Sequence, residues 1–259
     1  MPAEMTAENP RSAYQGLREV LLFNWPIYAS AAVISALVLW AMRWCRLPGL
    51  ISEVLSGLTI CCVFWGLSSL LVAHYVYDRT GLYKFEWLAQ YLPIAPRHWV
   101  NIHAGFDDTT EALRRALVGS EGEALDIFDP SEMTAPSIRR ARQLAGAALP
   151  APKAKLDELP APDGSQDAIF LIFTAHEIRR AGARRRFLGE LRRVLRPAGW
   201  LVIVEHARDV WNFLAFGPGF LHFQWRAEWH RVAEASGFGL VLAGSITPFV
   251  RVWVFGRAR

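Results

Sequence analysis

The stretch "VLRPAGWLVIVEH", residues 194–206, decides the fold. Pro197 and Gly199 cannot continue a helix, and they turn the chain tightly into the apolar run "WLVIVE". A short apolar run after such a turn is typical of a strand that is buried on both faces. The stretch therefore predicts a helix that ends near residue 195 and a core strand at about 200–205.

Strand and helix patterns alternate through the chain from His98 onward. The expected strands are 99–104, 124–128, 167–174, 200–205, 239–244 and 249–255, and the expected helices are 109–118, 131–144, 179–195 and 226–236. Apolar strands separated by amphipathic helices indicate an α/β fold with a mostly parallel sheet and helices on both faces. The stretch 141–164, rich in Ala and Pro, is expected to form a loop and one further short strand.

The run 159–209, which contains the opening stretch, resembles the S-adenosylmethionine-dependent class I methyltransferases. In that family an "LP-x-x-D-x-x-x-D" turn leads through the fourth strand to "hRVLKPGGxLxhxE" before the fifth strand. The ending "FGLVLAGSITPFVRVWVFGRAR" is similar to the family's final strand pair, whose last strand is antiparallel to its neighbours. The resemblance covers about residues 98–259 and implies a Rossmann-like methyltransferase sheet with S-adenosylmethionine as cofactor.

The segment "HAGFDDTT", residues 103–110, stands where this family has a glycine-rich cofactor loop. The resemblance implies that Gly105, Asp107 and Thr109 bind the cofactor, and either Thr109 or Thr110 is expected to cap the following helix. A sulfonium donor is positive and carries no pyrophosphate, so it needs fewer glycines than a dinucleotide does. We therefore predict a divergent but working cofactor loop.

Further cofactor contacts are implied at the ends of the next strands. Asp126 and Asp129 lie in "ALDIFDP", and Asp129 is the predicted partner of the ribose hydroxyls, with a plain Asp-Pro turn as the alternative. Lys155 stands where the family often has an acid near the adenine, so Asp157 is expected to replace it. Thr174 completes the predicted cofactor set.

Two strand ends, "TAHE" and "EHARD", would deliver chemistry-bearing side chains to one crevice, because ligands gather at the carboxyl ends of parallel strands. The predicted catalytic residues are His176, Glu177, Glu205 and His206, with either histidine removing a proton from the acceptor or joining the two loops by hydrogen bonds. A His/Glu cluster also admits a divalent metal ion. Adjacent side chains diverge on extended chain, however, so we predict no metal site.

The segment "VWNFLAFGPGFLHFQWRAEW", residues 210–229, is dense in aromatic residues and has few polar groups. This composition favours a pocket for a hydrophobic acceptor, with core packing of a helical lid as the alternative. The predicted substrate-binding residues are Arg208, Asn212, His222 and Trp225.

Two charge-free runs, 20–42 and 54–77, are long enough to cross a bilayer and are joined by a short link. Aromatic residues near their ends, Tyr75 and Tyr77 among them, are typical of the headgroup layer. We expect a transmembrane hairpin, with burial in a soluble core as the alternative. The predicted domains are an N-terminal flank (1–19), the hairpin (20–78), an interfacial segment and linker (79–97) and the methyltransferase-like domain (98–259).

Composition and charge limit the classes of partner that this chain is expected to bind. The chain of 259 residues is 53% hydrophobic with a net charge of +4, and no groove-reading motif accompanies its basic runs, so we expect no nucleic-acid partner. Cys45, Cys61 and Cys62 match neither a disulfide framework nor a zinc spacing. Basic residues flanking the hairpin favour cytoplasmic termini and a cytoplasmic catalytic domain. The oligomeric state is left open.

The sequence therefore predicts an integral membrane enzyme that transfers a methyl group to a lipophilic small molecule from the bilayer. The reduced glycine loop leaves one alternative of another class, a catalytically inactive methyltransferase-like domain that serves as a membrane-tethered interaction module.

Overall fold

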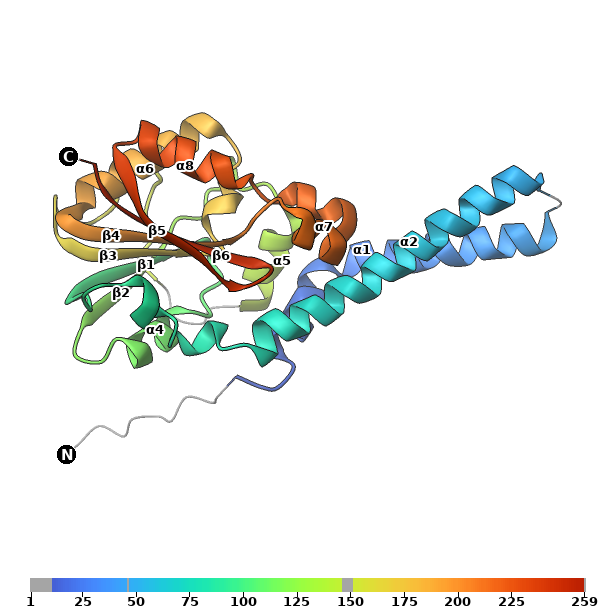
Figure 1. The fold of residues 1–259 in the computed structure, drawn as a ribbon, viewed down its shortest axis with the longest axis horizontal. Helices are drawn as coiled ribbons and strands as arrows, with labels where there is room; N and C mark the ends of the chain where they lie inside the picture. The colour runs from blue at the N-terminus through green and yellow to red at the C-terminus, as the bar shows by residue number, and fades with distance from the viewer. Residues whose placement is uncertain (1–10, 46, 146–150, 259) are drawn as a thin grey trace.

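Six strands form one sheet in the order β2-β1-β3-β4-β6-β5 (Figure 1). The computed structural model describes residues 11–45, 47–145 and 151–258. The strands are β1 His98–His103, β2 Glu121–Asp126, β3 Gln166–Ile172, β4 Leu195–His206, β5 Phe238–Thr247 and β6 Val250–Arg257. The first four are mutually parallel, whereas β6 lies antiparallel to both β4 and β5. This confirms the Rossmann-like methyltransferase sheet with its reversed final strand.

Helices cover both faces of the sheet. The helices of the domain are α3 Leu88–Tyr91, α4 Thr110–Ala116, α5 Pro136–Ala145, α6 Ala181–Val194, α7 Val210–Phe216 and α8 Arg226–Ala235, with short turns η3 Ala175–Glu177 and η4 Gly217–His222. Phe187 of α6 and Trp229 of α8 are fully buried against one face. Leu113 of α4 is buried against the other face. Apolar residues at helical spacing thus place each helix on the core.

The segment after the hairpin packs under the sheet. Four of its apolar side chains are buried on the face of the sheet that α4 also covers, next to strand residues such as Phe170: Leu82, Phe85, Trp87 and Leu88. The expectation of an interfacial linker at 79–97 is therefore wrong for these side chains. The mixture of aromatic and charged residues looks amphipathic in sequence, but the apolar members pack against the same face of the sheet as α4.

Element boundaries differ from the expectations near turns. The strand expected at 200–205 begins at Leu195 and pairs with β3 through a register shift, so the Pro197–Gly199 turn lies inside a bulge. The strand expected at 124–128 is Glu121–Asp126. Of the further strand expected within 141–164, the described residues form only isolated bridges such as Asp126 with Lys153; residues 146–150 lie outside the described part.

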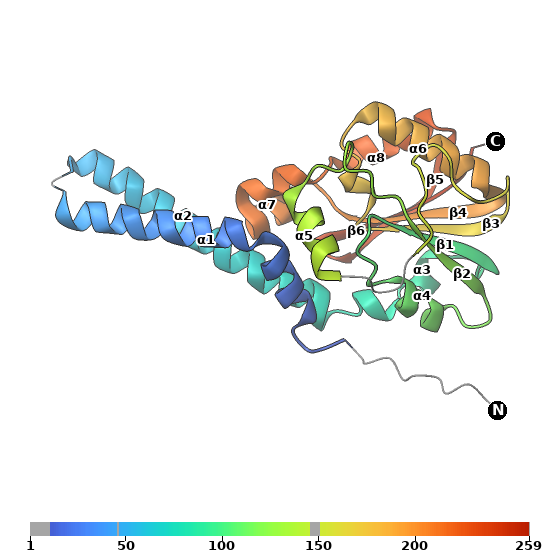
Figure 2. The same cartoon turned by 180° about the vertical axis from the view of Figure 1, so that it is seen from behind.

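The N-terminal helices, α1 Gln15–Trp44 and α2 Gly49–His74, form a long hairpin that projects from the α/β domain (Figures 1 and 2). Both are long and apolar enough to cross a membrane, judged by length and composition. Their apolar side chains face outward: Ile34 and Leu37 are both 59% exposed, and Leu58 is 62% exposed. The hairpin is therefore not packed into the core of the α/β domain.

A buried carboxylate fastens the base of the hairpin. The chain leaves α2 through a π-turn, η1 Tyr75–Arg79. Within it, Asp78 accepts hydrogen bonds from the backbone N–H groups of Gly16 (2.6 Å) and Leu17 (3.1 Å). These N–H groups belong to the first turn of α1, whose donors have no partner within the helix. Asp78, which follows α2, thus caps the first turn of α1 at the base of the hairpin.

The base of the hairpin also contacts the carboxyl ends of the strands. Phe23 of α1 packs edge-on against Phe106, in the loop after β1, with ring centroids 5.0 Å apart. Arg140 of α5 donates a hydrogen bond to the carbonyl of Phe23. Arg11, just before α1, forms an ion pair with Asp108 of the same loop at 3.0 Å. The apolar hairpin therefore begins directly at the edge of the sheet where a ligand site is expected.

Candidate active site

The loop after β1 turns at Gly105, whose φ is +86°. Its backbone N–H donates to Nδ1 of His103 at 2.9 Å. Asp107 caps α4, because its Oδ1 accepts hydrogen bonds from the N–H groups of Thr109 (3.2 Å) and Thr110 (2.9 Å). The expectation that a threonine caps this helix is thus wrong. Both threonine hydroxyls instead accept from the side chain of Asn101, so the loop is held from beneath.

A guanidinium fills the face of Gly105. A Cβ atom at this position would lie 1.2 Å from Nη1 of Arg142, so no larger residue fits here without moving Arg142. The same nitrogen donates to the carbonyl of Ala104 and lies 2.9 Å from Oδ2 of Asp126. Arg142 also lies over the ring of Phe128 at 4.2 Å. A ligand on this loop must therefore displace the Arg142 side chain.

Asp126, and not Asp129, is the last residue of β2. Asp126 is buried, whereas the carboxylate of Asp129 lies in a solvent-exposed turn and accepts from the N–H (2.8 Å) and hydroxyl (2.6 Å) of Ser131. These bonds from Ser131 lower the pKa of Asp129. The placement of Asp129 at the strand end is therefore wrong. Its geometry is that of the Asp-Pro turn weighed as the alternative.

The other predicted cofactor residues lie apart. Asp157 is exposed on the connection between β2 and β3. Beside it, Lys155 pairs with Glu158 at 2.8 Å on the surface. Thr174 is buried at the end of β3, and its hydroxyl donates to the carbonyl of Ile172 at 3.1 Å.

His176 lies between two carboxylates. Its Nδ1 is 2.7 Å from Oε2 of the fully buried Glu205, and its Nε2 is 3.3 Å from Oε1 of Glu177. Its backbone N–H also donates to Glu205. Burial by itself lowers the pKa of His176, but Glu205 and Glu177 outweigh burial and raise it to about 10. The ring is therefore an imidazolium at neutral pH, with no free nitrogen to act as a base.

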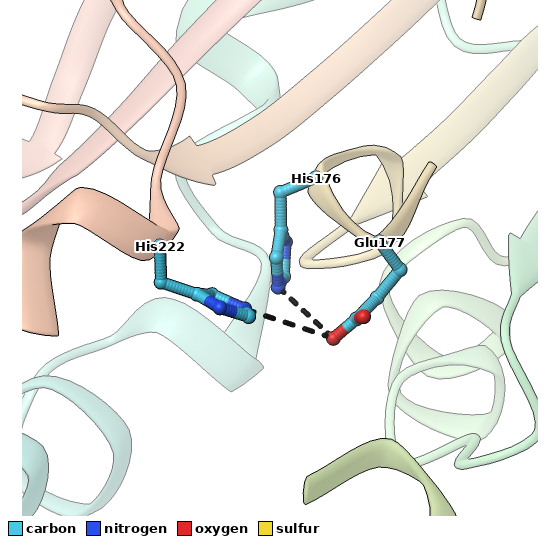
Figure 3. A group of neighbouring side chains, drawn as sticks. All are labelled: His176, Glu177 and His222. Atoms are coloured by element: carbon cyan, nitrogen blue, oxygen red, sulfur yellow. Dashed lines mark ion pairs between the residues drawn. The ribbon is translucent and has the colours of Figure 1, made fainter. Parts of the chain in front are cut away.

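His222 completes a cluster with His176 and Glu177 (Figure 3). It stands at the end of η4, and its Nε2 is 3.9 Å from Oε1 of Glu177. Arg179 holds His222 from another side, with Nη1 2.7 Å from its carbonyl oxygen and Nη2 2.7 Å from Nε2. Burial and the charges of His176 and Arg179 lower the pKa of His222 to about 3, so this ring is neutral.

The convergence of His176 with Glu177 differs from the expectation of divergent side chains. Residues Ala175–Glu177 form a 3-10 turn, not extended chain, so adjacent side chains reach the same space. The burial of Glu177 raises its pKa, but the hydrogen bond and charge of His176 outweigh this and lower it. Glu177 is consequently ionised, and its Oε2 atom is buried with no hydrogen-bond partner in the described part of the chain.

His206, at the end of β4, is enclosed by aromatic rings and has both nitrogens engaged. Nδ1 is 2.9 Å from the carbonyl of Phe249, which can only accept, so Nδ1 carries the proton. Nε2 then accepts from the hydroxyl of Tyr77 at 2.8 Å. Phe173 and Phe223 stack on the two sides of the ring. Burial lowers the pKa of His206 to about 4, so it is a neutral, structurally held histidine.

Tyr77 is the residue that links the hairpin to this site. We expected its ring in the headgroup layer, but it packs beside the ends of β3 and β4, in contact with Phe173 and His206. The π-turn after α2 redirects the chain, and a helical pattern drawn through this point misplaces the side chain.

The predicted substrate residues mostly organise the aromatic segment. Arg208 donates to the carbonyls of Phe223 and Leu221. Asn212 is buried, and its side chain bonds to His206, Asp209 and the carbonyl of Phe249. Trp225 is 56% exposed under the guanidinium of Arg208. Of the four, only His222 reaches the His176 cluster.

Sequence reasoning missed Asn101, Arg142, Arg179 and Tyr77 as site residues. Asn101 lies inside β1 between the apolar residues Val100 and Ile102, and a buried polar residue at such a position was an available signal. The other three reach the site through tertiary contacts that no local pattern marks.

Residues 105–203 match the family model described as "Methyltransferase domain". No curated protein gave a significant match. Among solved structures, the chain is similar to an S-adenosylmethionine-dependent methyltransferase from Aquifex aeolicus, with 20% identity, a TM-score of 0.51, and coverage of 69% of this chain and 93% of that one.

Two further structures are similar over more of this chain. The pyocyanin biosynthetic protein PhzM has 17% identity and a TM-score of 0.54, covering 93% of this chain and 73% of that one. The mitomycin 7-O-methyltransferase MmcR has 15% identity and a TM-score of 0.52, covering 96% of this chain and 74% of that one. At these identities the likeness concerns the fold.

The family match covers the chain from the loop after β1 to within β4, and the sheet order adds the reversed strand pair at the end. The sheet from β1 to β6 therefore has the Rossmann-like methyltransferase fold, and residues 105–203 within it match a methyltransferase domain.

Proposed function

We propose that this chain is a membrane-anchored methyltransferase that methylates a lipophilic small molecule dissolved in the bilayer. The observation that carries the proposal is the attachment of an apolar helical hairpin to the carboxyl edge of the sheet. Phe23 of the hairpin contacts the cofactor loop, and Tyr77 contacts the end of β4. An anchor with no role beyond tethering has no need of these contacts.

The hairpin has the dimensions and surface of a membrane element. A helix needs about 20 apolar residues to cross the hydrocarbon core. Helix α1 has 30 residues and α2 has 26. Arg11, Arg18, Arg79 and Lys84 flank the hairpin on the domain side, against Arg43 and Arg46 in the link, and we assign the domain end to the cytoplasm on this charge bias.

Helix α7 provides a second membrane contact beside α2. Phe213 packs edge-on against Trp65 of α2, with centroids 5.5 Å apart, and Ser68 of α2 donates to the carbonyl of Leu214. Trp211 is 50% exposed and Leu221 57% exposed on the outer side. Exposed aromatic and aliphatic groups next to an apolar hairpin fit the bilayer interface. An acceptor would then approach the crevice laterally from the lipid.

The residues at the loop after β1 fit the cofactor. Gly105 allows the backbone to approach a ligand closely, and the carboxylate of Asp126 stands at the end of β2, where ribose hydroxyls would bind once Arg142 moves aside. S-adenosylmethionine supplies the electrophilic methyl group, which passes from sulfur to the acceptor atom in an in-line displacement. Asp107 and Asn101 hold the loop, and Thr174 supports the end of β3.

The acceptor's polar group is assigned to the cluster of His176, Glu177 and His222. The buried, unpartnered Oε2 of Glu177 is the group we assign to accept the acceptor's hydrogen bond or proton. Glu205 orients His176 through two hydrogen bonds and is a positioning residue. His206 and Asn212 are assigned the same kind of role, because they tie α7 to the end of the sheet.

A transfer assay tests the proposal. The full chain, reconstituted in lipid nanodiscs, is incubated with methyl-labelled S-adenosylmethionine and a lipid extract of the membranes that carry it. We expect label in the organic phase with the wild type and at least about tenfold less with Glu177→Gln. A general base typically raises the rate of such a step by about 100- to 10,000-fold, and the glutamine cannot act as one. Label incorporated only into added soluble protein would contradict a lipophilic acceptor.

A non-catalytic module remains the second candidate, because Arg142 covers the face of the cofactor loop and pairs with Asp126. That function predicts no binding of S-adenosylmethionine by the wild type or by Arg142→Ala. Calorimetric titration of both proteins separates the candidates, since the enzyme is expected to bind the cofactor in at least the wild type.

A further inference from the structure

The cluster of His176, Glu177 and His222 has the composition of a metal site (Figure 3). One potential ligand atom from each residue lies within 4.8 Å of the other two. Two of the residues belong to the turn after β3 and the third ends η4, so the cluster bridges the sheet edge and the aromatic segment. Imidazole nitrogens and a carboxylate are ligands that several divalent transition metals accept.

The carboxylate of Glu177 is buried beside the two histidines and is only partly satisfied: its Oε1 lies 3.3 Å from Nε2 of His176 and 3.9 Å from Nε2 of His222. Glu177 is 5% exposed, and its Oε2 has no hydrogen-bond partner among the residues that the structure describes. A buried charged oxygen without a partner is costly, and a cation in contact with it would remove that cost.

Glu205 adds an independent feature of metal sites. It is fully buried, and its Oε2 lies 2.7 Å from Nδ1 of His176, which leaves Nε2 facing Glu177. Metal-binding histidines usually donate the second ring N–H to a carboxylate, which fixes the tautomer and the orientation of the ring. No such arrangement is needed for simple packing of a histidine.

We propose that Nε2 of His176, a carboxylate oxygen of Glu177 and a ring nitrogen of His222 bind a divalent transition-metal ion of the zinc type, with Glu205 orienting His176. Three protein ligands leave a coordination position open for an oxygen atom of the acceptor. The ion replaces the proton on Nε2 of His176, and that proton passes to solvent. Only the role of the ion in holding the acceptor rests on the proposed function. Binding of the ion itself is measured without cofactor or acceptor.

Arg179 defines the metal-free arrangement. Its Nη2 donates toward Nε2 of His222, and its Nη1 donates to the carbonyl of the same residue. Ion binding requires the imidazole to exchange the first bond for the metal, while the second bond can hold η4 in place. The site therefore needs a side-chain rotation and no change of fold.

Cobalt(II) serves as the probe. The detergent-purified full chain, treated with a chelator and dialysed, is titrated with Co²⁺ while its visible absorption is followed. We expect a saturable spectrum of a low-coordinate nitrogen- and oxygen-ligated ion, which Zn²⁺ then displaces. Absence of any such spectrum, with Zn²⁺ also giving no heat by calorimetry, would overturn the inference.

Variants locate the ion. Glu177→Gln and His222→Gln keep the side-chain size and are expected to abolish the spectrum, and Glu205→Gln is expected to weaken binding about 10- to 100-fold. The matched control is His98→Gln, which removes a His–Glu pair of 3.3 Å whose side chains are 44% and 86% exposed at the other edge of the sheet. Unchanged binding in Glu177→Gln and His222→Gln would place the ion elsewhere and overturn the assignment.

Titration of S-adenosylmethionine into the same preparations separates this inference from the proposed function. Cofactor binding with no Co²⁺ site would reject the metal and leave methyl transfer standing. A Co²⁺ site that Glu177→Gln abolishes, in a chain that binds no cofactor, would support the metal and reject the methyltransferase function.

Discussion

At the scale of residues, the site depends on a few buried polar contacts that bring distant segments together. Tyr77 joins the hairpin to His206, Arg142 joins α5 to Asp126, and Glu205 holds His176. The two residues of each contact are far apart in sequence. Loss of such a contact is therefore expected to affect both the stability of the fold and the geometry of the site.

Replacing Gly105 by Ala tests the close packing at the cofactor loop. Gly105 and Gly119 both have positive φ, +86° and +81°, but a Cβ at Gly119 would meet nothing within 4 Å, whereas a Cβ at Gly105 would collide with Arg142. Both substitutions should cost about 1 kcal/mol of backbone strain. Gly105→Ala should lower the thermal unfolding midpoint further than Gly119→Ala does. Equal midpoints would contradict the close contact with Arg142.

Removing the hydroxyl of Tyr77 tests the link from hairpin to site. Tyr77→Phe leaves Nε2 of the buried His206 without a donor, which should reduce the free energy of unfolding by about 1–3 kcal/mol. Tyr75→Phe, at a ring that is 47% exposed two positions earlier, is the control and should change little. Chemical denaturation in detergent compares the two, and equal losses would argue against the Tyr77–His206 bond.

The buried His206 predicts a pH dependence of stability. Its pKa is about 4 in the folded chain, below the ordinary 6.5, because of burial. Between these values the unfolded chain binds more protons, so this contribution is complete above pH 6.5 and is lost as the pH falls toward 4. The slope is at most about 1.4 kcal/mol per pH unit.

Unfolding midpoints from pH 7 to 4 measure this effect. The wild type should lose more stability over the interval than His206→Gln, while His98→Gln, at a side chain that is 44% exposed, should follow the wild type. Parallel curves for wild type and His206→Gln would show that His206 is not held neutral.

At the scale of elements, the alternating pattern from His98 predicted the parallel sheet, because apolar strand runs and amphipathic helices each encode burial locally. The turn at Pro197 and Gly199 located β4 for the same reason, although the bulge shifted its start to Leu195. The 3-10 turn that turns His176 and Glu177 toward each other and the π-turn that places Tyr77 depend on tertiary packing. Residue patterns could not predict them.

The capping of α1 by Asp78 gives a prediction at this scale. Asp78→Ala removes the acceptor of the N–H groups of Gly16 and Leu17, which should cost about 1–2 kcal/mol. Hydrogen exchange of the first turn of α1 should accelerate, whereas Glu53→Ala, at an exposed carboxylate of α2, should leave it unchanged. Unaltered exchange in Asp78→Ala would mean that α1 does not depend on this cap.

At the scale of the whole molecule, one chain combines an apolar hairpin with a domain of methyltransferase fold, and the hairpin base contacts the carboxyl ends of the strands. The class of the domain could be inferred from sequence, because its most specific motif lies within one continuous run. Sequence could not show which aspartate stands at the end of β2, because Asp126 and Asp129 are only three residues apart. The assignment of Asp126 to the ribose is our proposal. The position of the Arg142 guanidinium against Gly105 likewise depends on where α5 packs, which the sequence does not show.

Calorimetric titration of the detergent-purified chain with S-adenosylmethionine tests the central claim most directly. The wild type, Asp126→Asn and Asp129→Asn are compared, with thermal unfolding confirming that each is folded. We predict saturable binding by the wild type and by Asp129→Asn, and binding at least about tenfold weaker in Asp126→Asn, which loses a charged hydrogen-bond acceptor. No binding by the folded wild type would contradict the account, as would equal affinity in Asp126→Asn.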